Sequence, residues 1–160
     1  MRKYVLIGLV FAGIGSFFVW NQTSSVKTEY IAQVVKPTTP SVTINKLEIP
    51  VEVMRTEVEV QKGLSGRLSL GSKNGMLFIF NIADYYRFWM PDMHFPIDII
   101  WINNNKIIDI SHNVSNKLDP SKPKFYLPTK KANYVLEVNA GFSKKNNIKI
   151  GDSVFLNNVK

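Results

Sequence analysis

The sequence predicts a mainly β domain preceded by an N-terminal transmembrane or signal helix. Beyond residue 41, short apolar runs alternate with turn residues, which is typical of strands, and only residues 57–64 carry clear helix signals. The 160 residues, 45% of them hydrophobic, suffice for one ordinary domain with its own core. We therefore expect a small barrel or a strongly curled antiparallel or mixed sheet of about eight strands, with one or two short helices.

An uncharged apolar segment, residues 4–20, follows the two basic residues Arg2 and Lys3. As a helix, its 17 residues would extend roughly 25 Å, at the short end for the ~30 Å hydrocarbon layer of a bilayer. Because positive charge stays in the cytoplasm, the rest of the chain is expected on the outer side of the membrane. We predict a membrane anchor; the alternative is a signal peptide whose cleavage releases a secreted domain.

Three segments are expected along the chain. Residues 1–20 form the signal or anchor segment. Residues 21–40 form an extended tether, because they are rich in Ser, Thr, Lys and Pro. Residues 41–160 form the β-rich domain.

Capping and turn residues indicate the elements of this domain. Thr56 is the expected N-cap of the helix over 57–64, and Glu59 lies in its first turn. Asn74 and Gly75 signal a turn before a strand. The predicted strands are 42–44, 47–54, 76–80, 87–90, 97–102, 106–110, 134–138 and 153–156, and one further helical turn is expected over 141–147.

Composition and charge exclude several chemistries. The chain has no cysteine, which excludes disulfides, thiolate zinc sites and cysteine nucleophiles. The formal net charge of +8 favours anionic partners, and the long basic connection over residues 112–131 is a candidate surface for anionic lipid or a wall polymer, or else a solvated loop. Nucleic acid is not expected as a partner of an exported domain. No nucleotide or metal motif is complete, so no cofactor is expected.

Asp98 is the residue whose position most suggests a special role. It lies within an apolar strand and shares a face with Ile100 and Ile102. An ionised carboxylate there is costly unless it is paired or hydrogen-bonded. Two interpretations stay open. Asp98 is either an architectural carboxylate that pairs with Arg67 or caps backbone N–H groups, or a pocket carboxylate that acts as acid, base or ligand anchor.

Four further residues belong to the candidate pocket. Glu137 and Asn139 share one face of the strand over 134–138, and simple solvent exposure is the first expectation for Glu137. If the mouth of the barrel covers this face, both residues join Asp98 in one cleft. Trp89 and Met90 suit the wall of a small-molecule pocket, although such residues are more often core.

A metal site is not expected, because two histidines without cysteine argue against a standard zinc site. The one alternative is Cu(I). Met90, Met93 and His94 lie close together in the sequence, and soft thioether and imidazole ligands suit that ion.

Six short motifs occur in order over residues 46–156. They are GL-x-x-R-x-x-L from Gly63, GMLF from Gly75, FWM from Phe88, P-x-D from Pro96, VLEVNAG from Val135 and I-x-x-GD from Ile148. With them, the chain resembles the bacterial and archaeal family called domain of unknown function 192, or uncharacterised protein family 0127. The resemblance implies an exported or membrane-tethered protein and names no reaction. The chain departs from the family pattern at Ser65, where methionine is usual.

Three functions are compatible with these features. The anchor, the tether and the lack of a complete catalytic motif favour a binding or accessory module of the cell envelope, with a small pocket, over an enzyme. The alternatives are an envelope hydrolase that uses Asp98, with Glu137 as a second group, and a purely structural partner of another envelope protein. The sequence does not determine the oligomeric state.

Overall fold

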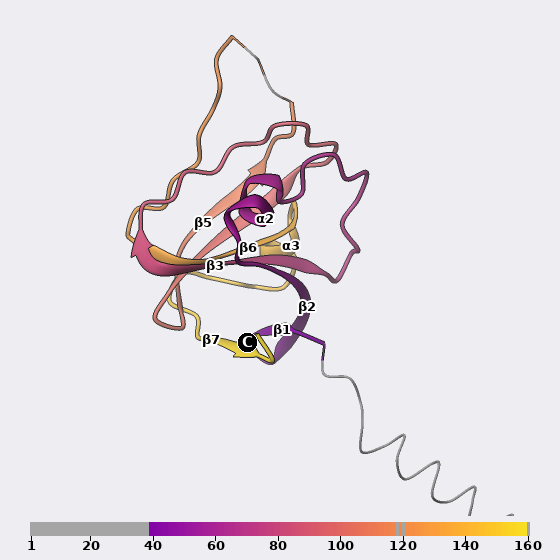
Figure 1. Cartoon of the computed structure of the whole chain (residues 1–160). Coiled ribbons are helices and arrows are strands. Elements are labelled where there is room, and N and C mark those ends of the chain that lie inside the picture. Colours follow the sequence, from indigo (N-terminus) through magenta and orange to yellow (C-terminus); the bar gives the residue numbers. More distant parts are fainter. Residues whose placement is uncertain (1–38, 118, 120, 160) are drawn as a thin grey trace, which may run out of the picture. The chain divides into compact units, whose positions relative to one another are not determined.

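The computed structural model describes residues 39–117, 119 and 121–159. The predicted anchor and nearly all of the predicted tether lie outside these residues. Within the described ranges, no helix is both long enough and apolar enough to cross a bilayer. The described part folds as one sheet with two short helices (Figure 1).

The sheet is mixed and contains seven strands in the order β5-β4-β6-β3-β2-β1-β7. Neighbouring strands are antiparallel except for β2 and β3, which are parallel. The mainly β prediction is therefore confirmed, with seven strands in place of eight. The elements are β1 (Ser41–Ile44), β2 (Leu47–Met54), α2 (Glu57–Lys62), β3 (Gly75–Asp84), β4 (Ile97–Asn103), β5 (Lys106–Val114), β6 (Ala132–Asn139), α3 (Phe142–Lys145) and β7 (Val154–Asn157).

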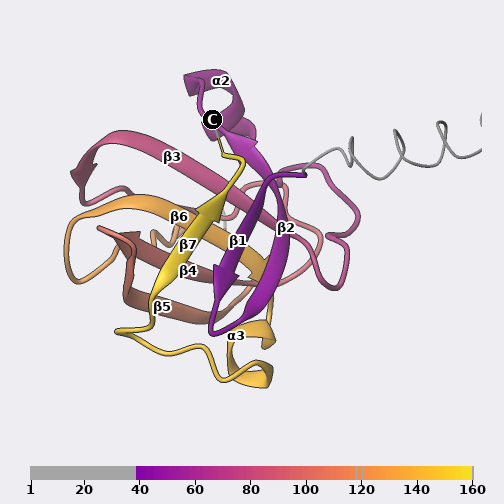
Figure 2. The same cartoon turned by 90° about the horizontal axis from the view of Figure 1, so that it is seen from below.

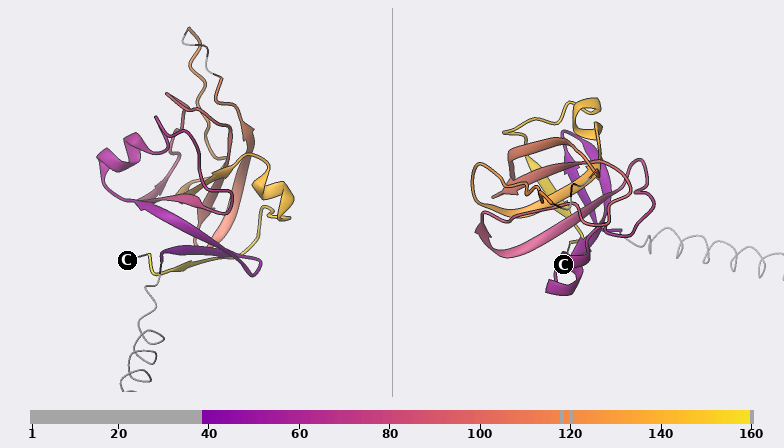
Figure 3. Two further views of the ribbon diagram at one scale, coloured as in Figure 1. Left: turned by 90° about the vertical axis from the view of Figure 1, so that its right-hand side faces the viewer. Right: turned by 90° about the horizontal axis from the view of Figure 1, so that it is seen from above.

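The sheet curls until its two edge strands meet at one end (Figures 2 and 3). The N–H of Ile107 in β5 donates to the carbonyl of Asp152 (3.0 Å), and the N–H of Val154 donates to the carbonyl of Asn105 (2.8 Å). This contact gives the sheet the curled, barrel-like form that the sequence predicts.

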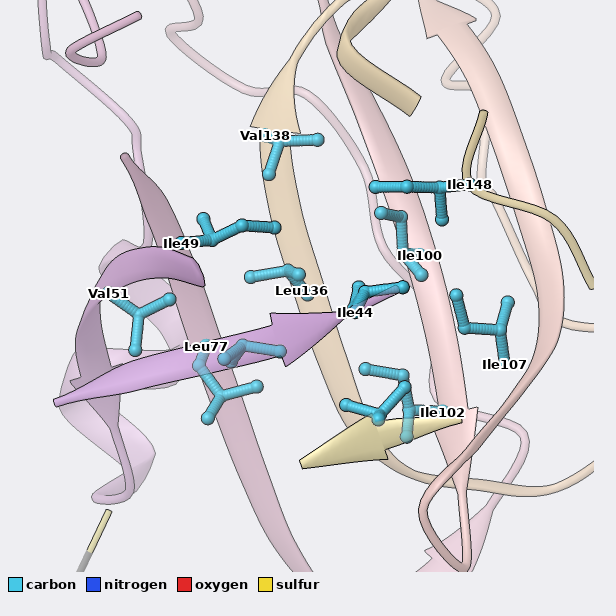
Figure 4. Close-up of a cluster of buried hydrophobic side chains, with 12 residues drawn as sticks. Ile44, Ile49, Val51, Leu77, Ile100, Ile102, Ile107, Leu136, Val138 and Ile148 are labelled. Carbon is cyan, nitrogen blue, oxygen red and sulfur yellow. The ribbon is translucent and has the colours of Figure 1, made fainter. Parts of the chain in front are cut away.

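Both faces of the sheet carry an apolar core. The inner core lies within the curl, where side chains such as Ile44, Leu77, Ile100 and Leu136 point toward one another (Figure 4). The outer core lies under the segments that follow α2 and β3. Its buried members are Leu64, Leu70, Met76, Phe78, Met90, Met93, Ile97, Ile99, Trp101, Val114, Ala132 and Val135. The central strands β4 and β6 contribute to both cores and are thus buried on both faces.

Helix α2 forms as its capping residues predict. The Thr56 hydroxyl accepts a hydrogen bond from the Glu59 N–H (3.3 Å), and the Glu59 carboxylate accepts one from the Thr56 N–H (2.9 Å). Gly63 follows the helix at a φ of +44°, a conformation that favours glycine. This turn directs the next residues, beginning with Leu64, onto the outer core.

The strand predicted over 87–90 is wrong. Only Phe88 finds a backbone partner there, through two hydrogen bonds with Tyr126 (2.9 and 2.7 Å). The Phe88 ring packs edge-on against Phe78 and Trp101, with ring centroids 5.1 and 5.3 Å apart. The alternation of buried and exposed side chains that suggests a strand is therefore real, but it reflects packing of an irregular segment.

Gly75 is the first residue of β3 and not part of a hairpin turn, because β3 runs parallel to β2. A Cβ atom at this position would lie 2.8 Å from Cδ1 of Leu136 and 3.1 Å from the carbonyl oxygen of Glu137. Glycine is required here because β6 passes close to the start of β3.

We expect Gly75→Ala to lower the free energy of unfolding by about 1–3 kcal/mol, because the added methyl group overlaps the β6 backbone. Urea unfolding at neutral pH measures this loss. Gly71→Ala is the matched control, because its Cβ would meet only the exposed side chain of Asn74, which can move. Equal stability of the two variants would contradict the close approach of β6.

Candidate ligand-binding site

A cavity of about 210 Å³ opens beside the C-terminal end of α2. Residues 60–65 form one wall, and the segment 86–91 that follows β3 forms another. Phe78 and Phe80 of β3 and Glu137 of β6 line it from the sheet. The cavity therefore lies on the outer face, between the sheet and the two segments that cover it.

Glu137 is the ionisable residue at the buried end of this cavity. In the sheet it pairs with Met76 of β3 and Ile99 of β4, both of which belong to the outer core. Glu137 is 6% exposed, so the simple solvent exposure expected from the sequence is wrong. The face that it shares with Val135 is covered, whereas the sequence pattern alone leaves it open to water.

The Glu137 carboxyl group receives no hydrogen bond from any residue that the structure describes. Burial raises the pKa of Glu137 to about 8. At neutral pH the group is therefore mostly protonated, and no neighbouring charge offsets its removal from water. Glu137 is therefore a buried residue whose carboxyl has no hydrogen-bond partner in the described ranges and is reached only through the cavity that it lines, which makes this position a candidate functional site.

Aromatic side chains line the cavity from its mouth inward. Trp89 is 51% exposed, and its ring stacks on Phe125 with centroids 6.1 Å apart. Tyr86 stacks on Phe80 at 3.6 Å. Met90 is buried and belongs to the outer core. Three of the six predicted pocket residues, Trp89, Met90 and Glu137, thus line one cavity.

Asp98 lies on the opposite face of the sheet, because it pairs with Val138 and shares the inner face with it. Its carboxylate accepts hydrogen bonds from the N–H groups of Asn113 (2.8 Å), Gly141 (3.1 Å) and Ser143 (3.0 Å), and from the Ser143 hydroxyl. Burial alone would raise the pKa of Asp98, but these hydrogen bonds together hold it below its ordinary value. The interpretation as a cap of backbone N–H groups is confirmed, and the proposed cleft shared with Glu137 is wrong.

Arg67 and Asn139 hold the segment between α2 and β3 onto the sheet. Arg67 forms two hydrogen bonds to Glu52 of β2 (2.6 and 2.8 Å), so its predicted pairing with Asp98 is wrong. The hydrogen bonds between the two side chains lower the pKa of Glu52 and raise that of Arg67. The Asn139 amide donates to the carbonyls of residues 70–71, both at 3.1 Å. Neither side chain lines the cavity.

Asp98, Ser143 and His112 form a chain of contacts, but not in the order of a catalytic triad. Nδ1 of His112 lies 3.0 Å from the Ser143 hydroxyl, which itself donates its proton to Asp98. The imidazole must therefore donate through Nδ1, so it does not act as a base toward this serine. Ser143 is fully buried, which excludes it as a nucleophile for an external substrate.

The residues of the Cu(I) alternative point to different surroundings. Met90 and Met93 pack into the outer core, whereas His94 is exposed and lies 3.7 Å from the Asp92 carboxylate. In the described ranges, no cluster of three or more His, Asp or Glu residues could hold a metal ion.

The basic connection begins after Val114, because β5 extends to that residue. Its side chains make scattered contacts: Lys131 lies 3.6 Å from Asp84, and Lys124 lies 5.0 Å from the ring centroid of Tyr126. Both lysines are exposed, so these contacts contribute little to stability.

Several lining residues are absent from the sequence-based pocket, namely Val60, Gln61, Lys62, Gly63, Leu64, Ser65, Phe78, Phe80, Tyr86, Arg87, Phe88, Pro91 and Met93. Gly63, Phe78, Phe88 and Glu137 belong to four of the six motifs. The convergence of four motifs on one cavity was the signal available in the sequence, but only the fold shows that they meet.

The fold and the cavity define a small curled-sheet domain with a carboxyl group at the buried end of an aromatic-lined pocket. Residues 40–156 match the family of domain of unknown function 192, described as "uncharacterized ACR", and the chain belongs to this family. A search of curated proteins finds no match.

Two crystal structures are similar to this chain. One is a protein of unknown function from Novosphingobium aromaticivorans, with 31% identity, a TM-score of 0.65, and coverage of 72% of this chain and 83% of that chain. The other is described as a "putative transcription regulator" from Sinorhizobium meliloti, with 24% identity, a TM-score of 0.64, and coverage of 73% and 91%. The second likeness shows the fold alone.

We expect Asp98→Asn to lower the free energy of unfolding by about 2–4 kcal/mol at pH 7, because an amide N–H then faces the Ser143 donors. The folded pKa of Asp98 is lowered, so the stability from the carboxylate is present above the ordinary value of 3.8 and is lost as pH falls through the folded value. The difference in free energy of unfolding between Asp98→Asn and wild type should therefore become smaller in acid. Urea unfolding at pH 7 and pH 3 tests this, with the exposed Asp84→Asn as control. Ser143→Ala should lower the free energy of unfolding by a smaller amount, with the same pH dependence. Unchanged stability of both variants would rule out the capping role.

We expect Glu137→Gln to raise stability above wild type at neutral pH. The folded pKa is raised from 4.5 to about 8, so the favourable contribution of this group is complete below pH 4.5 and is lost as pH rises to 8. The gain in the variant should grow over that window to about 3 kcal/mol at pH 7, at ~1.4 kcal/mol per pH unit. Unfolding curves at several pH values measure it, with Glu57→Gln on exposed α2 as control. A gain that does not change with pH would contradict the buried, unpaired carboxyl.

Proposed function

We propose that this domain is a small-molecule-binding module of the cell envelope, with its ligand in the cavity beside α2. The observation that carries the proposal is Glu137, a residue only 6% exposed whose carboxyl lacks a partner among the described residues and lines the cavity. A binding group kept unpaired in the free protein lowers stability and is satisfied when a ligand arrives.

The size of the cavity supports a small ligand. Its volume is about 210 Å³. An apolar cavity of roughly 150 Å³ in another protein holds one benzene molecule. The space here therefore suits a single ring with a short arm, and it is below the ~300–1,000 Å³ typical of sites for drug-sized ligands.

The segments that cover the cavity, α2 and the residues around Trp89, support access of a ligand from solvent. Helix α2 has six residues, none of them buried, and Trp89 at the mouth is half-exposed. Segments with few buried contacts open at low free-energy cost. A ligand could thus reach Glu137 by displacement of α2 or of the Trp89 side chain, without disruption of the sheet.

The envelope location is part of the proposal and rests on residues 1–40. The basic start, the apolar segment over 4–20 and the polar tether favour an anchored domain on the outer side of the membrane. The secreted form after cleavage is the alternative. Anionic lipid or a wall polymer remains the proposed partner of the exposed lysines in the basic connection.

A second candidate function is general acid–base catalysis by Glu137. A carboxyl whose pKa is raised to about 8 suits proton transfer near neutral pH. Asp98 does not suit this role, because its hydrogen bonds hold its pKa low and it lies on the other face of the sheet. Turnover of an envelope substrate that is lost in Glu137→Gln would favour this candidate.

We expect Val60→Trp to weaken binding of neutral single-ring fragments at least tenfold, because the larger side chain fills the cavity. Val58→Trp is the matched control: Val58 lies on the same helix, is 75% exposed and does not line the cavity. Since α2 has no buried residue, both variants should fold. Amide NMR shifts of the full-length chain measure binding, and the shifts should centre on residues 63–65 and 86–91. Equal binding by both variants would place the ligand elsewhere.

We expect alkaline phosphatase fused after Lys160 to be active in a bacterial host, because the domain is exported. Deletion of residues 2–20 should abolish that activity. Membrane fractionation and the intact mass of the chain distinguish an anchored from a cleaved form. An inactive phosphatase fusion, together with a C-terminal fluorescent-protein fusion that fluoresces in the cytoplasm, would contradict the proposed location.

A further inference from the structure

The lining of the cavity consists largely of aromatic side chains, thioethers and one carboxyl group. The cavity is lined by the aromatic side chains Phe78, Phe80, Tyr86, Phe88 and Trp89 and by the thioethers Met90 and Met93. Ring faces carry partial negative charge and attract cations. At the buried end, Glu137 adds two oxygen atoms. The inner lining thus favours a ligand group that is positive or donates hydrogen bonds.

The hydroxyl donors of the lining are already in use. The Ser65 hydroxyl donates to the carbonyl of Pro91 (2.9 Å), and the Tyr86 hydroxyl donates to the carbonyl of Ile82 (2.6 Å). A ligand carboxylate or phosphate at the buried end would meet no buried cation among the described residues. An anionic group there would therefore be left without the charge-assisted hydrogen bonds that it needs.

The positive side chains of the lining are confined to the mouth. Lys62 and Arg87 are both exposed, and the Arg87 guanidinium lies 5.6 Å from the ring centroid of Phe125, outside the cavity. Because solvent and salt screen exposed charges, their repulsion of an incoming cation is small compared with the attraction of a buried carboxylate.

We propose that the ligand of this cavity is a protonated amine on a single ring or a comparably short apolar body, with its ammonium group against the Glu137 carboxyl. This inference rests on the proposed binding function and names the class of its ligand. The ammonium donates to the carboxylate oxygens, and the aromatic and thioether side chains of the lining pack against the apolar body.

Binding of such an amine is linked to the loss of one proton from Glu137. The ion pair favours the ionised carboxyl, which the free protein disfavours. The other titratable groups that line the cavity are Lys62 of α2 and Tyr86 and Arg87 of the segment after β3. All three lie toward the mouth or are hydrogen-bonded elsewhere, so Glu137 should dominate the pH dependence between pH 6 and pH 8.

Three ligands that share a phenylethyl body test the inference: 2-phenylethylamine, 2-phenylethanol and 3-phenylpropionate. Calorimetry and amide NMR shifts of the full-length chain at pH 6, 7 and 8 give the affinities. We expect the amine to bind at least tenfold more tightly than the alcohol at pH 8, and its affinity to fall up to about tenfold per pH unit in acid. The alcohol should show no such fall, and the propionate should bind most weakly. In Glu137→Gln, the amine should lose its advantage while the alcohol still binds.

The outcomes separate the ligand class from the binding function. If the alcohol or the propionate binds as tightly as the amine and Val60→Trp blocks it, the cationic class is overturned and the cavity remains a binding site. If the amine keeps its advantage in Glu137→Gln, the class is also overturned. If none of the three shifts the amides of residues 63–65 and 86–91, the proposed function and the ligand class are both contradicted.

Discussion

The burial of β4 and β6 on both faces is the constraint on which the rest of this structure depends. A central strand of a curled sheet has an inner face within the curl and an outer face under covering segments, so each side chain must be apolar or find a partner. Most residues of β4 and β6 meet this demand with aliphatic side chains. The two carboxyl groups that these strands carry, Asp98 and Glu137, face the same demand on opposite faces.

The two carboxyls meet this demand in different ways. Asp98 of β4 accepts four hydrogen bonds from Asn113, Gly141 and Ser143, which join β5 and the N-terminus of α3 to β4 at one point. It is ionised and holds distant segments together. Glu137 has no such donors in the described part of the chain, and burial shifts its pKa toward the neutral form. One carboxyl therefore contributes to the architecture, and the other is available to a ligand at a cost in stability.

Local pattern was enough to predict the features that depend on neighbours in the sequence. The capping residues around Thr56 placed α2, and strand alternation placed Glu137 on the face opposite Leu136 and Val138. The local pattern could not predict contacts between segments that are distant in the sequence. Alternation cannot show that residues 60–65 and 86–91 cover that face, nor that Arg67 meets Glu52 rather than Asp98. For Asp98 the sequence left two interpretations open, because the choice depends on donors from two segments that only the fold brings together.

The proposed site depends on Glu137 as a buried residue whose carboxyl has no partner in the described part of the chain. A ¹³C NMR titration of this side-chain carboxyl in the full-length chain tests that most directly, with Glu137→Gln to assign the signal. We expect a midpoint near 8, because burial raises the pKa of Glu137 to about 8, well above the ordinary 4.5. A midpoint at or below 4.5 would mean that the group is solvated or paired, and would contradict its role as an unpaired carboxyl.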